Sequence, residues 1–188
     1  INSDHFWRLS RGLDSRPVVS EHHAKSISHE NTFSVDIDDP ETLQAWLQEL
    51  AGQVATRMRR HGIKGKTVQI KVRFSDFRTI TRSYTLEEPT FSTRDIESAA
   101  KQLFANVWKE SPQPVRLLGA GMSNLRFRAA VQQTLFDAEE KQKHARIDEA
   151  CDSVKEKFGK AAVRTGSSLE RGVRMRRNPL TEDRQDDS

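Results

Sequence analysis

A run of alternating residues between Lys66 and Leu86 carries side chains that are suited to binding phosphate groups. In the sequence KTVQIKVRFSDFRTITRSYTL, every second residue from Val68 to Phe74 is apolar, and the residues between them are polar or cationic. This period of two is that of a β-strand with one buried face and one open face. Alternation resumes after a Ser-Asp pair, so the segment predicts two strands joined by a tight turn.

The predicted open face offers hydroxyl, amide and cationic groups and almost no carboxylate. Such a face favours a polyanion, because Lys, Arg, Ser and Thr side chains are common donors to the phosphates of nucleic acids. A solvated antiparallel sheet also has one polar face, so both interpretations stay open on this segment alone. With the first and last strands included, the residues predicted to contact such a polyanion are Ser26, Ser28, Lys71, Arg73, Arg78, Thr79, Thr81, Arg82 and Arg116.

Two arginines of this set do not fit the alternation. Arg78 and Arg82 share the parity of Ile80, so a strict period of two places them on the covered face. They could still reach solvent by extending past the edge of the sheet, as long cationic side chains do.

A second candidate site is the pentapeptide QQTLF, which begins at Gln132 and ends with Leu135 and Phe136. It lies in a polar stretch that follows the last predicted strand. An exposed Leu-Phe pair there favours a role in binding a partner protein. The alternative is that both side chains pack back on the domain or on the following helix, and the spacing leaves both interpretations open.

The elements that must position these residues follow the order strand, helix, strand, strand, helix, strand. Strands are predicted over residues 25–37, 66–74, 79–86 and 115–122. The first helix begins with an Asp39 cap and Pro40 and ends at Gly62, and the second begins at Ser92 or Thr93. This order is the split βαβ arrangement of the α+β class, a four-stranded antiparallel sheet with two helices on one face.

The C-terminal third has a different character. Ile147, Cys151, Val154 and Phe158 are spaced four, three and four residues apart, which predicts an amphipathic helix over residues 139–160. Residues 161–188 are rich in Gly, Ser, Arg and Asp, and we expect them to be disordered.

Composition excludes several classes of protein. The 188 residues carry a net charge of +4, and 35% are hydrophobic. One cysteine excludes an internal disulfide and fits a reducing compartment, so we expect the cytoplasm. We find no membrane span, no secretory signal, no nucleophile–base pair and no metal-binding cluster, and predict neither catalytic nor metal-ligating residues. The chain begins at Ile1 in mid-pattern, so we expect a C-terminal piece of a longer protein.

Three separated motifs resemble the little-finger domain of Y-family translesion DNA polymerases. They are KSISHENTF at residues 25–33, VRFSDFRTITRS at residues 72–83 and VRLLGAGMSNL at residues 115–125. Residues 6–18, FWRLSRGLDSRPV, are similar to the end of that family's thumb and its tether. The resemblance covers roughly residues 6–158 in matching order.

The resemblance implies a division of the chain and a role for each part. Residues 1–24 would be the end of the thumb and a linker, residues 25–125 the DNA-binding little finger, and residues 126–138 a peptide that binds the sliding clamp. In that peptide Gln132, Leu135 and Phe136 would make the contacts.

The resemblance also implies the setting of this segment. The little finger would grip the primer–template duplex of an error-prone DNA polymerase. The magnesium ions would be held by the palm, which would lie outside this segment. The segment itself would bind no cofactor and should be inactive alone. We expect a monomer.

Two alternatives have the same fold. One is a free-standing RNA-binding module, but such modules stack bases on aromatic residues of the central strands. The open face predicted here presents Gln69, Lys71, Thr79 and Thr81 instead. The other is a structural subunit whose sheet packs on a protein.

Overall fold

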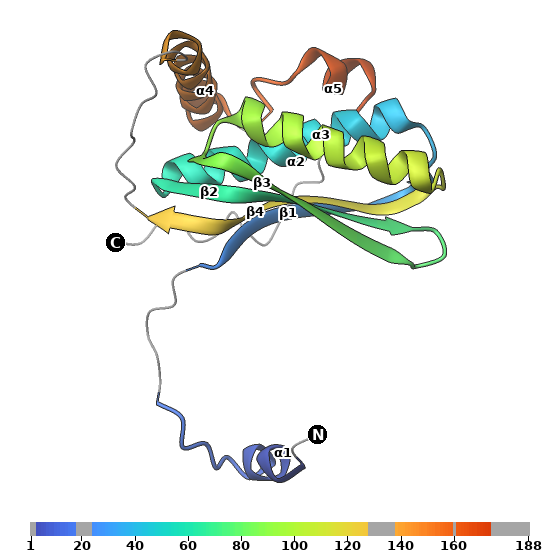
Figure 1. Ribbon diagram of the computed structural model, residues 1–188, viewed down its shortest axis with the longest axis vertical. Coiled ribbons are helices and arrows are strands. Elements are labelled where there is room, and N and C mark those ends of the chain that lie inside the picture. Colours follow the sequence, from blue (N-terminus) through green and yellow to red (C-terminus); the bar gives the residue numbers. More distant parts are fainter. Residues whose placement is uncertain (1–2, 18–23, 128–137, 160, 174–188) are drawn as a thin grey trace.

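The computed structural model contains a four-stranded antiparallel sheet with two helices on one face (Figure 1). It describes residues 3–17, 24–127, 138–159 and 161–173. The elements are α1 (Ser3–Ser10), β1 (Ser26–Ile37), α2 (Pro40–Arg60), β2 (Ile63–Phe74), β3 (Thr79–Thr90), α3 (Thr93–Glu110), β4 (Val115–Phe127), α4 (Ala138–Phe158) and α5 (Gly166–Glu170). The predicted α+β class and the βαββαβ order are confirmed.

Local signals set the helix boundaries. The Asp39 side chain accepts hydrogen bonds from the first backbone N–H groups of α2, and Gly62 takes a φ of 62° just after the helix ends. The cap of α3 is Ser92, whose side chain accepts a hydrogen bond from the backbone nitrogen of Asp95. Both helices therefore begin where their capping residues predict.

The strands lie in the order β1-β4-β2-β3, and each neighbouring pair is antiparallel. The unit β1–α2–β2 therefore has β4 between its two strands, and the unit β3–α3–β4 has β2 between its two strands. The central strands are β2 and β4, whereas β1 and β3 form the edges. Strand β4 continues to Phe127, five residues beyond its predicted end at Met122, because its second half pairs with the start of β2.

The hydrophobic core fills the space between the sheet and the two helices. The predicted apolar faces of α2 and β2 are buried, including Leu47 and Phe74. Tyr84 is an exception, because it has the parity of the covered face but is half exposed on the edge strand β3. None of the described helices is both long enough and apolar enough to span a membrane.

Two glycines allow β4 to lie close to its neighbours on the open face of the sheet. A Cβ atom at Gly121 would approach the Cβ of Ser28 to 2.9 Å, and one at Gly119 would approach that of Glu30 to 3.1 Å. Both distances are shorter than ordinary van der Waals contacts. The Gly-Ala-Gly sequence of β4 therefore serves close strand packing.

We expect Gly121→Ala to destabilise the protein by about 1–3 kcal/mol, because the added methyl group forces neighbouring strands apart. Gly52→Ala is the matched control: that glycine lies within α2, nothing lies within 4 Å of its added Cβ, and we expect a gain of about 0.5–1 kcal/mol. Urea unfolding of both variants checks this. Equal stability of the two variants would contradict the packing argument.

Part of the tail is ordered, contrary to the disorder predicted from residue 161. Helix α5 packs beside α2, where Ser167 donates a 2.6 Å hydrogen bond to Gln48 and Arg171 pairs with Asp39. Val173 is 2% exposed and belongs to the core. The composition of residues 161–173 suggested disorder, but a few well-placed side chains fix this segment on the helical layer. Residues 174–188 lie outside the described residues.

Helix α4 forms in the segment where a helix is predicted, but it docks in an unexpected way. Of its predicted apolar stripe, Ile147 and Phe158 are exposed, while Cys151 and Val154 are half-buried. The inward contacts are made instead by the carboxylates of Asp148 and Asp152. Helix α4 therefore docks through charge rather than through its apolar stripe.

Candidate nucleic-acid interface

Six of the nine residues predicted to contact DNA share the open face of the sheet. The strand registers place them in rows that run across β1, β4, β2 and β3. Successive rows contain Ser26, Ser123, Thr67 and Thr85; Ser28, Gly121, Gln69 and Ser83; Glu30, Gly119, Lys71 and Thr81; and Thr32, Leu117, Arg73 and Thr79. The period-2 prediction is thus confirmed for Ser26, Ser28, Lys71, Arg73, Thr79 and Thr81.

One carboxylate interrupts this face. Glu30 accepts a 3.0 Å hydrogen bond from the Nζ of Lys71, across the intervening Gly119 of β4. The side chains are 37% (Lys71) and 53% (Glu30) exposed, so the ion pair lies at the surface. A polyanion binding here would compete with Glu30 for Lys71.

The two ends of the face differ. At one end, the Nε of Arg73 donates a 2.9 Å hydrogen bond to the hydroxyl of Thr79. At the other end, the Thr67 hydroxyl is 3.1 Å from that of Thr85 and accepts a 2.8 Å hydrogen bond from Asn124. Thr67 is only 7% exposed, so its hydroxyl is used within the protein. Cationic donors therefore gather toward the Arg73 end.

Arg78 and Arg82 lie apart from this group, on the side of the sheet that carries the helices. Arg82 donates a 3.3 Å hydrogen bond to Glu110 at the end of α3. The Arg78 guanidinium lies 4.9 Å from the ring centroid of the buried Phe74. Both side chains are 47% exposed, so either could reach a ligand only around the β3 edge or the end of the sheet.

Arg116 is positioned beside the turn between β2 and β3. Its guanidinium lies 4.9 Å from the ring centroid of Phe77, and its NH1 nitrogen is 3.6 Å from Asp36. The side chain is 41% exposed. Arg116 is therefore held at the same end of the sheet as Arg73.

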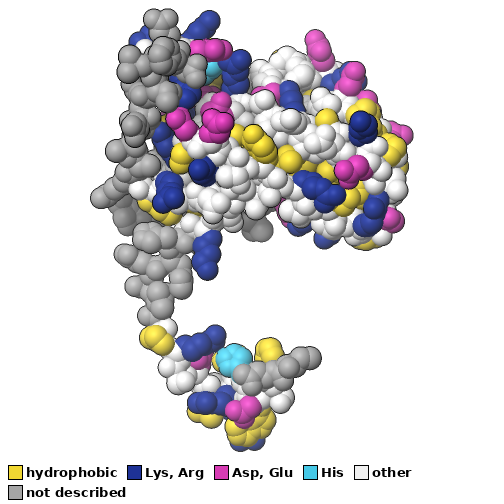
Figure 2. Space-filling model, viewed as in Figure 1, with side chains coloured by type: hydrophobic (Ala, Val, Ile, Leu, Met, Phe, Trp, Pro, Cys, Tyr) yellow, Lys and Arg dark blue, Asp and Glu magenta, His cyan; other side chains and the backbone are white. Residues whose placement is uncertain are grey.

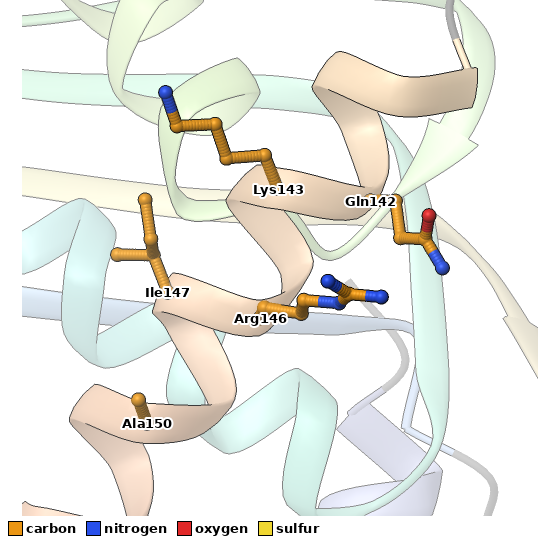
Figure 3. A pocket seen from close by; sticks show the side chains of 5 residues that line it. All are labelled: Gln142, Lys143, Arg146, Ile147 and Ala150. Atoms are coloured by element: carbon orange, nitrogen blue, oxygen red, sulfur yellow. The ribbon is translucent and has the colours of Figure 1, made fainter.

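The predicted clamp-binding residues Gln132, Leu135 and Phe136 lie outside the described residues. A shallow hollow beside α4 is lined by Gln142, Lys143, Arg146, Ile147 and Ala150, whose side chains all project from that helix (Figure 3). It contains no nucleophile and no carboxylate. Within the part of the chain that the structure describes, no three His, Cys, Asp or Glu side chains lie where they could hold a metal ion.

Basic and acidic side chains are interspersed on the side of the molecule shown in Figure 2. Ion pairs also join elements within the protein: Arg94 of α3 binds Glu140 of α4, and Lys141 of α4 binds Glu88 of β3. The charges visible on this side therefore do not form one large basic patch.

Sequence reasoning missed the most highly connected polar side chain of the helical layer, Arg59. Its guanidinium bonds to Asp152 at 2.6 Å and to Asp148 at 3.1 Å, and its side chain is only 11% exposed. It also donates to the backbone oxygen of Phe91 and to the Thr93 hydroxyl. The available signal was the pair of acids four residues apart in α4, which share one helix face.

Comparison with known proteins now identifies this fold. A family model described as the impB/mucB/samB family C-terminal domain matches residues 24–135. A DNA polymerase IV of Dehalococcoides mccartyi strain CBDB1 is 36% identical over 155 residues, covering 82% of this chain and 39% of that protein. A DNA polymerase IV of Streptomyces coelicolor is 42% identical over 119 residues, covering 63% of this chain and 24% of that protein.

A Y-family DNA polymerase chimera of known structure has the same fold, with a TM-score of 0.53 and 13% sequence identity over 67% of this chain and 36% of that chain. The chain spans 39% or less of the length of the two polymerases compared above. Since the family model covers more than half of the chain, the protein belongs to the impB/mucB/samB C-terminal domain family.

Proposed function

We propose that this chain holds the primer–template duplex and tethers an error-prone translesion polymerase to its sliding clamp. The observation that carries the DNA-binding part is the open sheet face, where four strands present hydroxyl and cationic donors in register. Family membership supports the same role. Among the described elements, helices α2 and α3 lie on the opposite face of the sheet (Figure 1).

The chemistry of this face suits the DNA backbone rather than the bases. Ser, Thr, Lys and Arg donate to phosphate oxygens, and such contacts carry no sequence information. The central strands present Gln69, Lys71, Gly119 and Gly121 on this face and no aromatic side chain, which disfavours the RNA-binding alternative. Contacts to the backbone alone would let a polymerase move along any template, and its affinity would fall steeply with salt.

The clamp-binding part of the proposal depends on Gln132, Leu135 and Phe136. Leu135 and Phe136 would fill an apolar pocket on the clamp, and Gln132 would form a hydrogen bond at its rim. A weak peptide contact of this kind raises the local concentration of polymerase at the primer end and needs no additional DNA contact.

Nucleotidyl transfer is proposed for the longer protein and not for this chain. Two magnesium ions held by carboxylates would supply that chemistry in the palm. The described residues of this chain contain no carboxylate cluster suited to such a pair. We therefore expect this chain to bind and position DNA without extending a primer.

Fluorescence anisotropy with a primer–template duplex across a salt series tests DNA binding. We expect Arg73→Ala and Arg116→Ala each to weaken binding equally on duplexes of different sequence and to reduce the salt slope by about 1. The matched control is Lys101→Ala, because Lys101 lies on α3 and pairs with Glu97 on the covered side of the sheet. A change in sequence preference, or tighter binding to single-stranded RNA, would contradict the proposal.

The same assay decides the role of Arg82. The sequence predicts a DNA contact, whereas the structure places this side chain beside Glu110 on the helical side. If DNA reaches around the edge strand β3, Arg82→Ala weakens binding as Arg73→Ala does. If only the open face binds, the Arg82 variant behaves like the Lys101 control.

Removing the carboxylate of Glu30 should strengthen DNA binding. In Glu30→Gln, Lys71 loses its ion-pair partner and a phosphate no longer meets a negative charge on this face. Because an exposed ion pair typically contributes about 0.2–1 kcal/mol, we expect affinity for duplex DNA to rise by about 1.4- to 5-fold. Glu97→Gln on the helical side is the control, and unchanged affinity in Glu30→Gln would place the DNA elsewhere.

A further inference from the structure

The turn between β2 and β3 has an unusual residue in its last position. The backbone nitrogen of Phe77 donates a 3.0 Å hydrogen bond to the oxygen of Phe74, and the nitrogen of Phe74 donates a 3.0 Å bond to the oxygen of Arg78. The loop between the strands is therefore Ser75, Asp76 and Phe77. Loops of this length end in a left-handed residue, a position that favours glycine. Here Phe77 occupies that position with a φ of 64°.

Folding does not explain the choice of phenylalanine. A residue with a Cβ atom is strained in the left-handed region, so a β-carbon makes this turn less stable than glycine would. The ring of Phe77 is 64% exposed, and it therefore gains little from burial. A strained, exposed aromatic side chain is a reason to look for a ligand.

The surroundings of the ring indicate what kind of ligand this is. The guanidinium of Arg116 lies 4.9 Å from the ring centroid and covers part of the ring. The Thr79 hydroxyl joins the turn to the open sheet face, since it donates to the Phe77 oxygen at 3.5 Å and accepts from Arg73 at 2.9 Å. Asp36, 3.6 Å from Arg116, is the carboxylate beside this pair.

We propose that Phe77, supported by Arg116, stacks on an unpaired base of the template strand where that strand leaves the duplex. This inference rests on the proposed binding of primer–template DNA. An aromatic ring stacks on any base, and neighbouring arginines hold the adjoining phosphates, which is the usual chemistry of single-strand binding. Bases inside a duplex are stacked on both faces, so a single exposed ring selects an unpaired base.

The test compares two DNA probes, a blunt duplex and the same duplex with a single-stranded template overhang of thymidines. The whole 188-residue chain is expected to bind the overhang probe about tenfold more tightly than the blunt probe. Phe77→Gly should remove this preference, leave blunt-duplex affinity unchanged and keep or raise the melting temperature. Phe77→Trp should retain the preference, and Tyr84→Ala, which removes another half-exposed aromatic side chain, should have no effect on it.

Each other outcome has a definite meaning. Equal weakening of both probes by Phe77→Gly would show that the ring only orients Arg116, and a lower melting temperature would show that it serves the turn, so either result overturns the stacking proposal. Duplex binding by the unchanged chain without preference for the overhang overturns this inference alone. Binding of neither probe overturns the proposed function as well.

Discussion

Replacing both Leu135 and Phe136 by alanine is expected to abolish binding to the sliding clamp while leaving duplex affinity unchanged. Burying a large apolar side chain contributes about 1.5–3 kcal/mol, so loss of two such contacts should weaken a clamp peptide by at least a hundredfold. Surface plasmon resonance on an immobilised bacterial clamp measures this loss. Anisotropy with a primer–template duplex, under the same buffer conditions, measures the DNA affinity of the same variant.

Controls within the peptide distinguish anchors from spacers. Gln133 and Thr134 are assigned no contact with the clamp. We therefore expect the single variants Gln133→Ala and Thr134→Ala to bind the clamp about as tightly as the unchanged chain does. Gln132→Ala should weaken binding less than the double variant, because one hydrogen bond contributes about 0.5–1.5 kcal/mol. If the double variant instead lowers the melting temperature and still binds the clamp, then Leu135 and Phe136 pack on this chain's own domain.

Most of the sheet and both of its helices could be predicted from local patterns. The Asp39 and Ser92 caps and the alternation along β2 act over a few residues, and the structure agrees with them. The same alternation correctly placed Lys71 on the open face of the sheet and Arg82 on the face that carries the helices. Predictions of this kind succeed because each depends on one helix or strand at a time.

Features that depend on strand order could not be read in the same way. Lys71 and Glu30 meet because β4 lies between their strands and has a glycine where they approach. Glu30 lies two residues after Ser28, so the alternation alone could have placed it on the open face. Its ion pair with Lys71 required the register across three strands, which no single segment of sequence contains.

The tail shows where composition misleads. A segment with few apolar residues is expected to be disordered, because it buries too little surface to offset its conformational entropy. Residues 161–173 have this composition, yet Arg171 binds Asp39 and Glu41 at the start of α2, and Val173 enters the core. Helix α4 is likewise held by acidic residues rather than by its apolar stripe. In both cases the partners are far away in the sequence.

Arg59 is the side chain whose loss we expect to destabilise the protein most strongly. It joins α2, the start of α3 and α4, and Asp148 also accepts a 3.0 Å hydrogen bond from the backbone nitrogen of Thr93. Removing one partner of a buried ion pair costs about 3–5 kcal/mol. Because the three side chains are 11–20% exposed, we expect Arg59→Met to lower the free energy of unfolding by about 2–4 kcal/mol. Urea unfolding at pH 7 measures this change.

Arg94→Met is the matched control, because Arg94 also binds α4 but through Glu140, and those side chains are 56% and 68% exposed. An exposed pair of this kind should cost at most about 1 kcal/mol. Adding Asp152→Asn to Arg59→Met should recover part of the lost stability, since the carboxylate left without its partner is removed. Additive effects of the two substitutions would mean that the pair does not act as a unit.

The pH dependence of the Arg59 effect provides an independent check. Burial acts to raise the pKa of Asp152, but hydrogen bonds from Arg59 and Thr56 outweigh it and hold that pKa below its ordinary value of 3.8. A carboxyl group whose pKa is lower in the folded state stabilises the fold above its unfolded pKa and loses that contribution as the pH falls through the folded value. The difference in stability between the unchanged chain and Arg59→Met should therefore be full at pH 7 and shrink below about pH 4. A difference that stays constant down to pH 3 would mean that Arg59 stabilises the helices through its contacts with Phe91 and Thr93, and that α4 docks independently of this charge pair.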